Sequence, residues 1–326
     1  MSRSLTGLRG AGVLVALATT MFAPAVASAA SPGHFRGVIT ANTPAGRAYK
    51  AQVHPARQRV TNLTYHSGPV MHADRNYAIY WSPGGSGYSA GYQSIINGYF
   101  ANVAAASGQT TNDYSIATQY YDSAGKIAYN ATSGGGLADT NPYPASGCTA
   151  GGGGPCLTDA QLQTELNTYL TAHNLPRGLG TMYFVYFPTG VTTCFDSSGS
   201  QCSSNVYCAY HSSFGSGALT VLYADMPYAG VSGCQTGQYP NGDTAGDSAA
   251  NVTSHENIEA ITDPLGNAWY DSSGNEIGDK CNFNFGSPLG GPSGAEYNEI
   301  MPSPSGGHYW LQQEWSNAVS GCAQRS

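Results

Sequence analysis

Met182-Tyr183-Phe184-Val185-Tyr186-Phe187 is the run that decides the fold class, because every position in it is apolar or aromatic. Such a run is typical of a central strand that is covered on both faces of a sheet. Residues 218–224 have nearly the same character, and the aromatic run at residues 76–81 predicts another short strand. The sequence therefore predicts a sheet with a buried centre.

Helical patterns lie between these strands. Apolar residues recur at helical spacing over residues 92–106 and again over residues 159–172, where Thr158 can act as the N-cap. Residues 133–155 are mostly Gly, Pro, Ser and other small or polar residues, which predicts a long loop. Strands and helices alternate, so we expect an α/β fold with a mixed central sheet, flanking helices and long loops.

The run Asn251-Val252-Thr253-Ser254-His255-Glu256-Asn257-Ile258-Glu259-Ala260-Ile261-Thr262-Asp263-Pro264 predicts a further helix, which starts near Ser248 and ends before the proline. Three apolar residues fall on one side of it and are expected to face the sheet. They are Ala250, Ile258 and Ile261. The opposite side carries polar residues and is the more informative one.

That polar side contains a pattern suited to binding a metal ion. A turn of 3.6 residues places His255 and Glu259 one above the other, with Glu256 beside them. This is the layout of the His-Glu-x-x-His zinc helix with Glu in place of the second His, and Glu is an acceptable zinc ligand. The sequence thus predicts a zincin-like active helix, with His255 and Glu259 as ligands and Glu256 as general base.

A zinc ion with an open coordination position needs a third protein ligand. By analogy with thermolysin-like enzymes we expect it about twenty residues after the second ligand, and Asp279 lies there. Glu276 and Asp271 are the alternatives, while Asp263 precedes a proline and suits a turn. Two carboxylates and one imidazole form a hard ligand set, so zinc is the expected ion and calcium and manganese stay open.

A hydrolase would also need a donor for the oxyanion. The possible donors are His211, His308 and Tyr309, and His211 is the first choice because it lies just before a predicted strand. A second chemistry is suggested by Gly87-Tyr88-Ser89-Ala90-Gly91, which matches the Gly-x-Ser-x-Gly nucleophile pattern. Ser89 lies eight residues past Trp81, however, so it does not leave the strand at once as that turn requires.

The N-terminal region predicts an exported protein. Residues 1–30 combine Arg3 and Arg9 with a short apolar core and a small-residue end, as in a secretory signal peptide. Residues 31–60 are rich in Pro, Ala and Arg without periodicity, and they indicate an extended leader or a pro-segment, with order beginning near Tyr65. Residues 61–326 are expected to form a single domain, and the mature chain to be secreted and extracellular.

Charge and cysteine content agree with this setting. Without the two arginines of the signal peptide, the chain has 10 basic and 19 acidic side chains. This negative net charge argues against nucleic acid and anionic membranes as partners. All eight cysteines follow the signal, so disulfides are expected. Because short loops close most cheaply, we expect these pairs: Cys148 with Cys156, Cys194 with Cys202, Cys208 with Cys234, and Cys281 with Cys322.

Several blocks, in order along residues 62–322, resemble the phosphate-induced protein 1 (EXORDIUM-like) family. They are Tyr65-His66-Ser67-Gly68-Pro69-Val70-Met71, residues 76–81, Cys208-Ala209-Tyr210-His211-Ser212, residues 260–270, and Trp315-Ser316-Asn317 before Cys322. The resemblance implies a secreted or wall-associated protein without an established reaction, and the His-Glu-x-x-Glu pattern indicates the secreted bacterial branch. That pattern is not carried over from the plant members.

Two functional hypotheses follow. The first is a secreted zinc-dependent hydrolase, resembling a peptidase, with Glu256 as general base and a peptide as substrate. The alternative is a non-catalytic extracellular or cell-wall-associated protein that binds glycan through Tyr-rich loops. In both cases the partner is a peptide or a cell-wall polymer.

Overall fold

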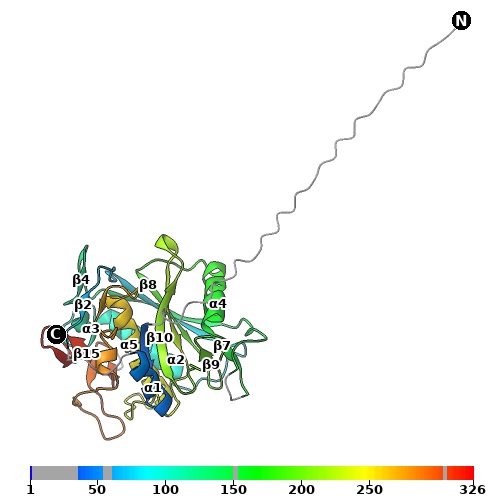
Figure 1. The fold of residues 1–326 in the computed structure, drawn as a ribbon. Coiled ribbons are helices and arrows are strands. Elements are labelled where there is room, and N and C mark those ends of the chain that lie inside the picture. Colours follow the sequence, from blue (N-terminus) through cyan, green and yellow to red (C-terminus); the bar gives the residue numbers. More distant parts are fainter. Residues whose placement is uncertain (2–35, 54–60, 150–152, 304–306) are drawn as a thin grey trace.

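The computed structural model describes residues 1, 36–53, 61–149, 153–303 and 307–326. The main sheet has six strands in the order β1-β10-β11-β8-β3-β6. Its strands β8 and β10 are labelled near the middle of the ribbon in Figure 1. The six strands are β1 (Arg36–Thr40), β10 (Tyr207–Phe214), β11 (Val221–Met226), β8 (Thr181–Tyr186), β3 (Asp74–Trp81) and β6 (Ala131–Asp139). The last four in this order are parallel, whereas β10 is antiparallel to β11 and β1 to β10. The predicted mixed sheet is confirmed.

Helices cover both faces of this sheet. α2 (Tyr92–Ala105) and α5 (Thr244–Thr262) share one hydrophobic cluster with Met182, Phe184 and Tyr186 of β8. The intervening residues Tyr183 and Val185 belong to a second cluster with α4 (Asp159–Ala172). Successive strand residues point to opposite faces, so the continuous apolar run of β8 reflects a core on each side.

The remaining elements are short. Two further helices are α1 (Pro44–Val53) and α3 (Tyr114–Ala117), and two 3-10 turns are η1 (Gly217–Leu219) and η2 (Asp279–Cys281). Five strand pairs lie outside the main sheet: β2 (Thr64–Tyr65) with β12 (Trp269–Tyr270), β4 (Tyr121–Asp122) with β5 (Gly125–Lys126), β7 (Cys156–Thr158) with β9 (Thr192–Cys194), β13 (Glu299–Met301) with β14 (Gly307–Tyr309), and β15 (Glu314–Ser316) with β16 (Gly321–Ala323). Among the described helices, none is long and apolar enough to cross a membrane.

Two of the predicted helices are confirmed with small shifts at their ends. α4 starts as expected, because Thr158 and Gln161 form a reciprocal capping box. Two sequence expectations are wrong. Residues 133–139 of the expected loop belong to the edge strand β6, whose pairing with β3 overrides their high glycine content. Residues 217–219 form η1, so that β11 starts later than expected.

Regular secondary structure begins before Tyr65, contrary to the sequence expectation. Residues 36–53 form β1 and α1, and β1 is the edge strand of the main sheet beside β10. The expectation of an extended leader is therefore wrong for these residues, because pairing with β10 supplies the structure that their composition does not suggest. Removal of residues 31–60 stays a prediction, and the signal-peptide expectation for residues 1–30 falls almost entirely outside the described residues.

α5 is the central helix of the molecule and is buried along its whole length from Ala245 to Thr262. It begins four residues before the expected Ser248, because the Asp243 side chain accepts hydrogen bonds from the backbone of Ala245 and Gly246. It ends at Thr262, as Pro264 predicts. A helix this enclosed has no solvent-facing side.

Polar side chains make some of the contacts between α5 and the sheet, which the apolar stripe did not predict. Thr253 hydrogen bonds to Tyr186 of β8 at 2.7 Å, and Asn257 accepts a hydrogen bond from Asn76 of β3 at 2.9 Å. On another side, the backbone N–H of Gln312 donates to Asn251 at 2.7 Å. Buried polar groups of this kind need partners, and these bonds fix the rotation of the helix.

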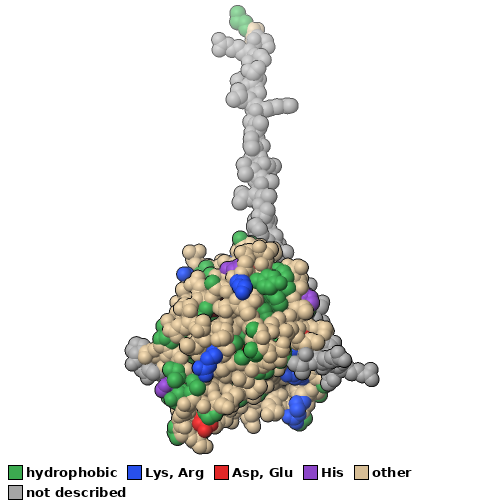
Figure 2. All heavy atoms as spheres, turned by 90° about the vertical axis from the view of Figure 1, so that its left-hand side faces the viewer, with side chains coloured by type: hydrophobic (Ala, Val, Ile, Leu, Met, Phe, Trp, Pro, Cys, Tyr) green, Lys and Arg blue, Asp and Glu red, His purple; other side chains and the backbone are tan. Residues whose placement is uncertain are grey.

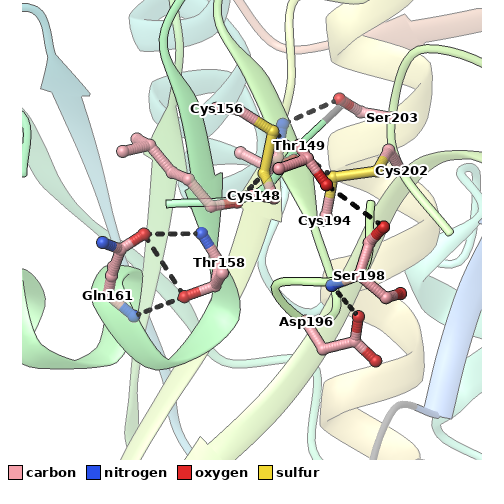
Figure 3. The surroundings of a disulfide bond; sticks show 12 residues. Cys148, Thr149, Cys156, Thr158, Gln161, Cys194, Asp196, Ser198, Cys202 and Ser203 are labelled. Atoms are coloured by element: carbon pink, nitrogen blue, oxygen red, sulfur yellow. Dashed lines mark hydrogen bonds between the residues drawn. A yellow bond between two sulfur atoms is a disulfide. The ribbon is translucent and has the colours of Figure 1, made fainter. Parts of the chain in front are cut away.

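All four expected disulfides are present: Cys148–Cys156, Cys194–Cys202, Cys208–Cys234 and Cys281–Cys322. The first two lie side by side (Figure 3), with the Sγ atoms of Cys156 and Cys194 3.6 Å apart. They meet because β7 and β9 pair in parallel. Since these sulfurs are bonded, their closeness is not a thiolate metal site.

The acidic residues are mostly inside the protein. Fourteen of the 19 Asp and Glu side chains are buried, and the face seen in Figure 2 shows few charged side chains among uncharged and apolar ones. The premise that the net charge forms an acidic surface is therefore wrong. The expectation that nucleic acid and membranes are not partners loses this support and stays a prediction.

Candidate metal centre

The three motif residues lie on α5 and point into the protein interior. His255, Glu256 and Glu259 are all 0% exposed. One neighbour is β10, which contributes His211, and another is η2, which contributes Asp279; these two side chains are 3% and 4% exposed. Elements far apart in the sequence thus bring five ionisable side chains together.

The first group is the one that the sequence predicted. His255 Nε2 lies 3.2 Å from Glu259 Oε1, as expected for residues one helical turn apart. The contact lacks hydrogen-bond geometry, and neither ring nitrogen of His255 has a hydrogen-bond partner among the described residues. The backbone N–H of Asp279 donates to Glu259 Oε1 at 2.9 Å. Ligand atoms of His255, Glu259 and Asp279 all lie within 4.8 Å of one another.

A second group surrounds His211. Its Nδ1 atom lies 3.2 Å from Glu256 Oε2 and 3.7 Å from Glu259 Oε2. Its Nε2 atom faces Glu276 Oε1 at 3.9 Å. Ligand atoms of His211, Glu256 and Glu259 again lie within 4.8 Å of one another. The sequence pointed to His211 only as an oxyanion donor and did not group it with the motif carboxylates.

Two further acids border the site. Glu276 and Glu314 are 0% exposed, and neither oxygen of either carboxyl group has a hydrogen-bond partner among the described residues. The backbone N–H of Glu276 donates to Asp279 Oδ2 at 3.2 Å, so Glu276 supports the predicted third ligand. Sequence reasoning missed Glu314, because its distance along the chain from the motif carries no periodic signal.

Comparison with known proteins supports the family resemblance. The chain is 24% identical over 301 residues to Protein EXORDIUM-like 5 of Arabidopsis thaliana, a match that covers 81% of this chain and 78% of the relative. The chain is a distant homologue of the EXORDIUM-like proteins. No family model and no solved structure matches it significantly.

Burial and crowding dominate the electrostatics of this EXORDIUM homologue. Burial, followed by the neighbouring Glu259 carboxylate, raises the pKa of both Glu256 and Glu276 well above the usual range. Burial by itself would lower the pKa of His255, but Glu259 and Asp279 outweigh it and raise that pKa. Without a cation, the cluster therefore favours the protonated, neutral form of Glu256 and Glu276.

Several predicted residues do not join the site. Asp271, an alternative third ligand, pairs with Lys280 at 3.0 Å instead, and Asp263 accepts hydrogen bonds from two backbone N–H groups of the turn after α5. His308 stacks on Tyr297, and Tyr309 accepts a hydrogen bond from Asn102. These contacts are structural.

Ser89 also has a structural contact. Its Oγ donates to Asp243, the N-cap of α5, at 2.7 Å. Its surroundings therefore explain the Gly-x-Ser-x-Gly match as an anchor for the start of α5, and they give no support to serine catalysis.

The N-terminal residues cover the site. Gly37 of β1 has a φ of +60°, and a Cβ atom there would lie 2.1 Å from His211 Nδ1 and 2.3 Å from Glu259 Oε2. Lys50 of α1 donates to the backbone carbonyl of Asp279 at 3.2 Å. Residues 36–53 are thus packed against the buried carboxylates.

We predict that Gly37→Ala destabilises the protein by more than the strain of a left-handed residue alone. Gly85→Ala is the matched control, because Gly85 has a φ of +63° but no atom within 4 Å of the position that a Cβ would occupy. Both changes carry the strain of roughly 1 kcal/mol, and only Gly37→Ala adds a clash with His211 and Glu259. Urea unfolding of both variants checks this, and equal midpoints would contradict the close packing of β1.

We predict that the metal-free protein loses stability as the pH rises. A carboxyl group whose folded pKa lies above its ordinary value near 4.5 stabilises the fold below that value and loses this contribution as the pH climbs toward the raised pKa. Glu276→Gln should reduce the loss above about pH 5. Unfolding midpoints in chelator measure it, and identical pH slopes for wild type and Glu276→Gln would refute the assignment.

Proposed function

We propose that the chain is a secreted zinc-dependent hydrolase, in which His255, Glu259 and Asp279 hold the metal and Glu256 is the general base. The observation that carries the proposal is the convergence of these three ligands to within 4.8 Å in a fully buried site. Sequence spacing suggested the same three residues independently. The four disulfides fit an oxidising compartment.

Charge balance supports a bound cation. Burying an ionised carboxylate without a partner is costly, so such groups are either protonated or paired with a cation. Here Glu256, Glu259, Glu276 and Asp279 lie around two imidazoles, and the nearest lysine contact of the cluster goes to a backbone carbonyl instead of a carboxylate. A divalent ion would supply the missing positive charge.

The ligand types fit zinc, with two carboxylates and one imidazole from the protein. Such an ion would lower the pKa of a bound water and polarise a carbonyl group. Glu256 lies beside the ligands, in the position that a general base for a metal-bound water requires. His211, at 3.2 Å, orients one oxygen of Glu256. A peptide is the proposed substrate because the motif is that of peptidases.

Substrate access would require a change at the N-terminal cover. The ligands are at most 4% exposed, and the backbone of Gly37 lies against His211 and Glu259. Catalysis therefore depends on displacement of residues 36–53, which agrees with the pro-segment expectation. Activity tests must compare the full chain before and after limited proteolysis.

We predict that His255→Ala abolishes tight zinc binding at the site formed with Glu259 and Asp279, whereas Asp271→Asn keeps it. Asp271 is the matched control, since it lies near the same turn but pairs with Lys280. After limited proteolysis of both proteins, Glu256→Gln should retain zinc and lose about 10²- to 10⁴-fold in peptide hydrolysis relative to an active wild type. Elemental analysis and a broad peptide library measure the two effects. Zinc-free wild-type protein, or equal hydrolysis by wild type and Glu256→Gln, would reject the metal or the base, respectively.

A second possible function is glycan binding without catalysis, with the metal as a structural ion. Most of the buried large side chains are tyrosines, which leaves fewer for Tyr-rich binding loops than the sequence suggested. One exposed aromatic group fits the role: Tyr121 is 44% exposed and packs against Trp269 and Tyr65 at 5.1 and 5.4 Å. Aromatic faces of this kind suit sugar rings.

We predict for this alternative that Tyr121→Ala weakens binding to a cell-wall polysaccharide panel, while His255→Ala leaves binding intact. The two residues lie in different parts of the fold, so the pair separates a surface role from the metal site. Affinity electrophoresis on the panel is the measurement. Unchanged binding by Tyr121→Ala, or hydrolysis by the wild type, would argue against the non-catalytic function.

A further inference from the structure

Glu259 is placed between the two groups of ligands. Its Oε1 atom lies 3.2 Å from His255 Nε2, on the side of Asp279, and its Oε2 atom lies 3.7 Å from His211 Nδ1, on the side of Glu256. Each oxygen thus belongs to a different triad, and both triads have their ligand atoms within 4.8 Å. A carboxylate with this placement can bridge two cations, which in two-metal sites are about 3.5 to 4 Å apart.

The surroundings of His211 match those of a metal ligand. Its Nδ1 atom faces Glu256 and Glu259, and its Nε2 atom faces Glu276 at 3.9 Å. Metal-binding histidines commonly direct the second ring nitrogen to a carboxylate, which fixes the ring orientation. Glu276 is 0% exposed, and neither of its oxygens has a hydrogen-bond partner among the described residues, so it is available for that role.

The number of buried carboxylates also supports a second cation. Four buried carboxylates, those of Glu256, Glu259, Glu276 and Asp279, surround the two triads. Together with the bordering Glu314, which is also 0% exposed, these groups when ionised exceed the charge of one divalent ion, and a second ion reduces the excess. The competing source of positive charge is a protonated His211, which would bind Glu256 through an Nδ1–H hydrogen bond at the observed 3.2 Å.

We propose that the chain binds a second divalent cation through His211, Glu256 and Glu259, so that Glu259 bridges a two-metal centre. This inference rests on the proposed metal at His255, Glu259 and Asp279. Glu256 uses Oε2, the atom facing His211, as the ligand, and its Oε1 atom, which has no hydrogen-bond partner among the described residues, remains available to accept a proton. The two triads together define a centre suited to hydrolysis.

The test uses the full secreted chain, stripped with chelator and reloaded with Zn²⁺ or Mn²⁺. Elemental analysis should find two ions per chain in wild type and in Asp271→Asn, and one in His211→Ala and in His255→Ala. In the Mn²⁺-loaded wild type, electron paramagnetic resonance should show a spin-coupled pair, and each His variant should show an isolated ion. The coupled wild-type signal supports the proposal even where a variant fails to fold.

The outcomes separate the two proposals. One ion in wild type, with His211→Ala also keeping one, overturns the two-metal centre and leaves the single zinc site intact. No bound ion in wild type overturns both. Two ions without spin coupling, or two ions in His211→Ala, would place the second ion elsewhere and overturn the bridging role of Glu259.

Discussion

The fold depends on enclosing one polar helix on all sides. α5 is buried along its length, and its side chains contact the sheet, α2, α3 and the C-terminal segment. Because buried polar groups need partners, two of these neighbours supply them: Asn76 and Tyr186 from the sheet, and Gln312 from the C-terminal segment. Asp243 caps the helix and also binds Ser89, so the loop before α2 is tied to the same element.

The burial of α5 leaves a cluster of carboxyl groups without enough basic side chains beside it. His255, Glu256 and Glu259 occupy one side of α5, and the chain brings more carboxylates to them from η2 and the loop before it. The Cys281–Cys322 disulfide starts in η2 and pins that turn to β16, beside Lys280, which packs over Trp315 at 4.2 Å. A covalent bond thus helps to hold acids together, an arrangement that favours a bound cation over simple core packing.

Distant homology to EXORDIUM-like 5 fits a shared scaffold and leaves the reaction open. The candidate centre combines that scaffold with the His-Glu-x-x-Glu helix, and the N-terminal residues 36–53 close over it. A buried, covered site is compatible with a structural ion and with a precursor form of a hydrolase. A structural ion needs no opening of the site, whereas a hydrolase needs β1 to separate from β10. That separation depends on strand pairing at the edge of the sheet and not on the metal ligands.

The sequence determined those features that depend on local pattern or short spacing. They include the central strands, α2 and α4 with its Thr158 cap, the end of α5 before Pro264, the four disulfides, and Asp279 as the neighbour of Glu259. Tertiary structure alone decided the rest. His211 and Glu314 reach the motif through sheet order and loop packing, and residues 36–40 become a strand because β10 offers an open edge. Such contacts arise between segments far apart in the chain, where no periodicity links the partners.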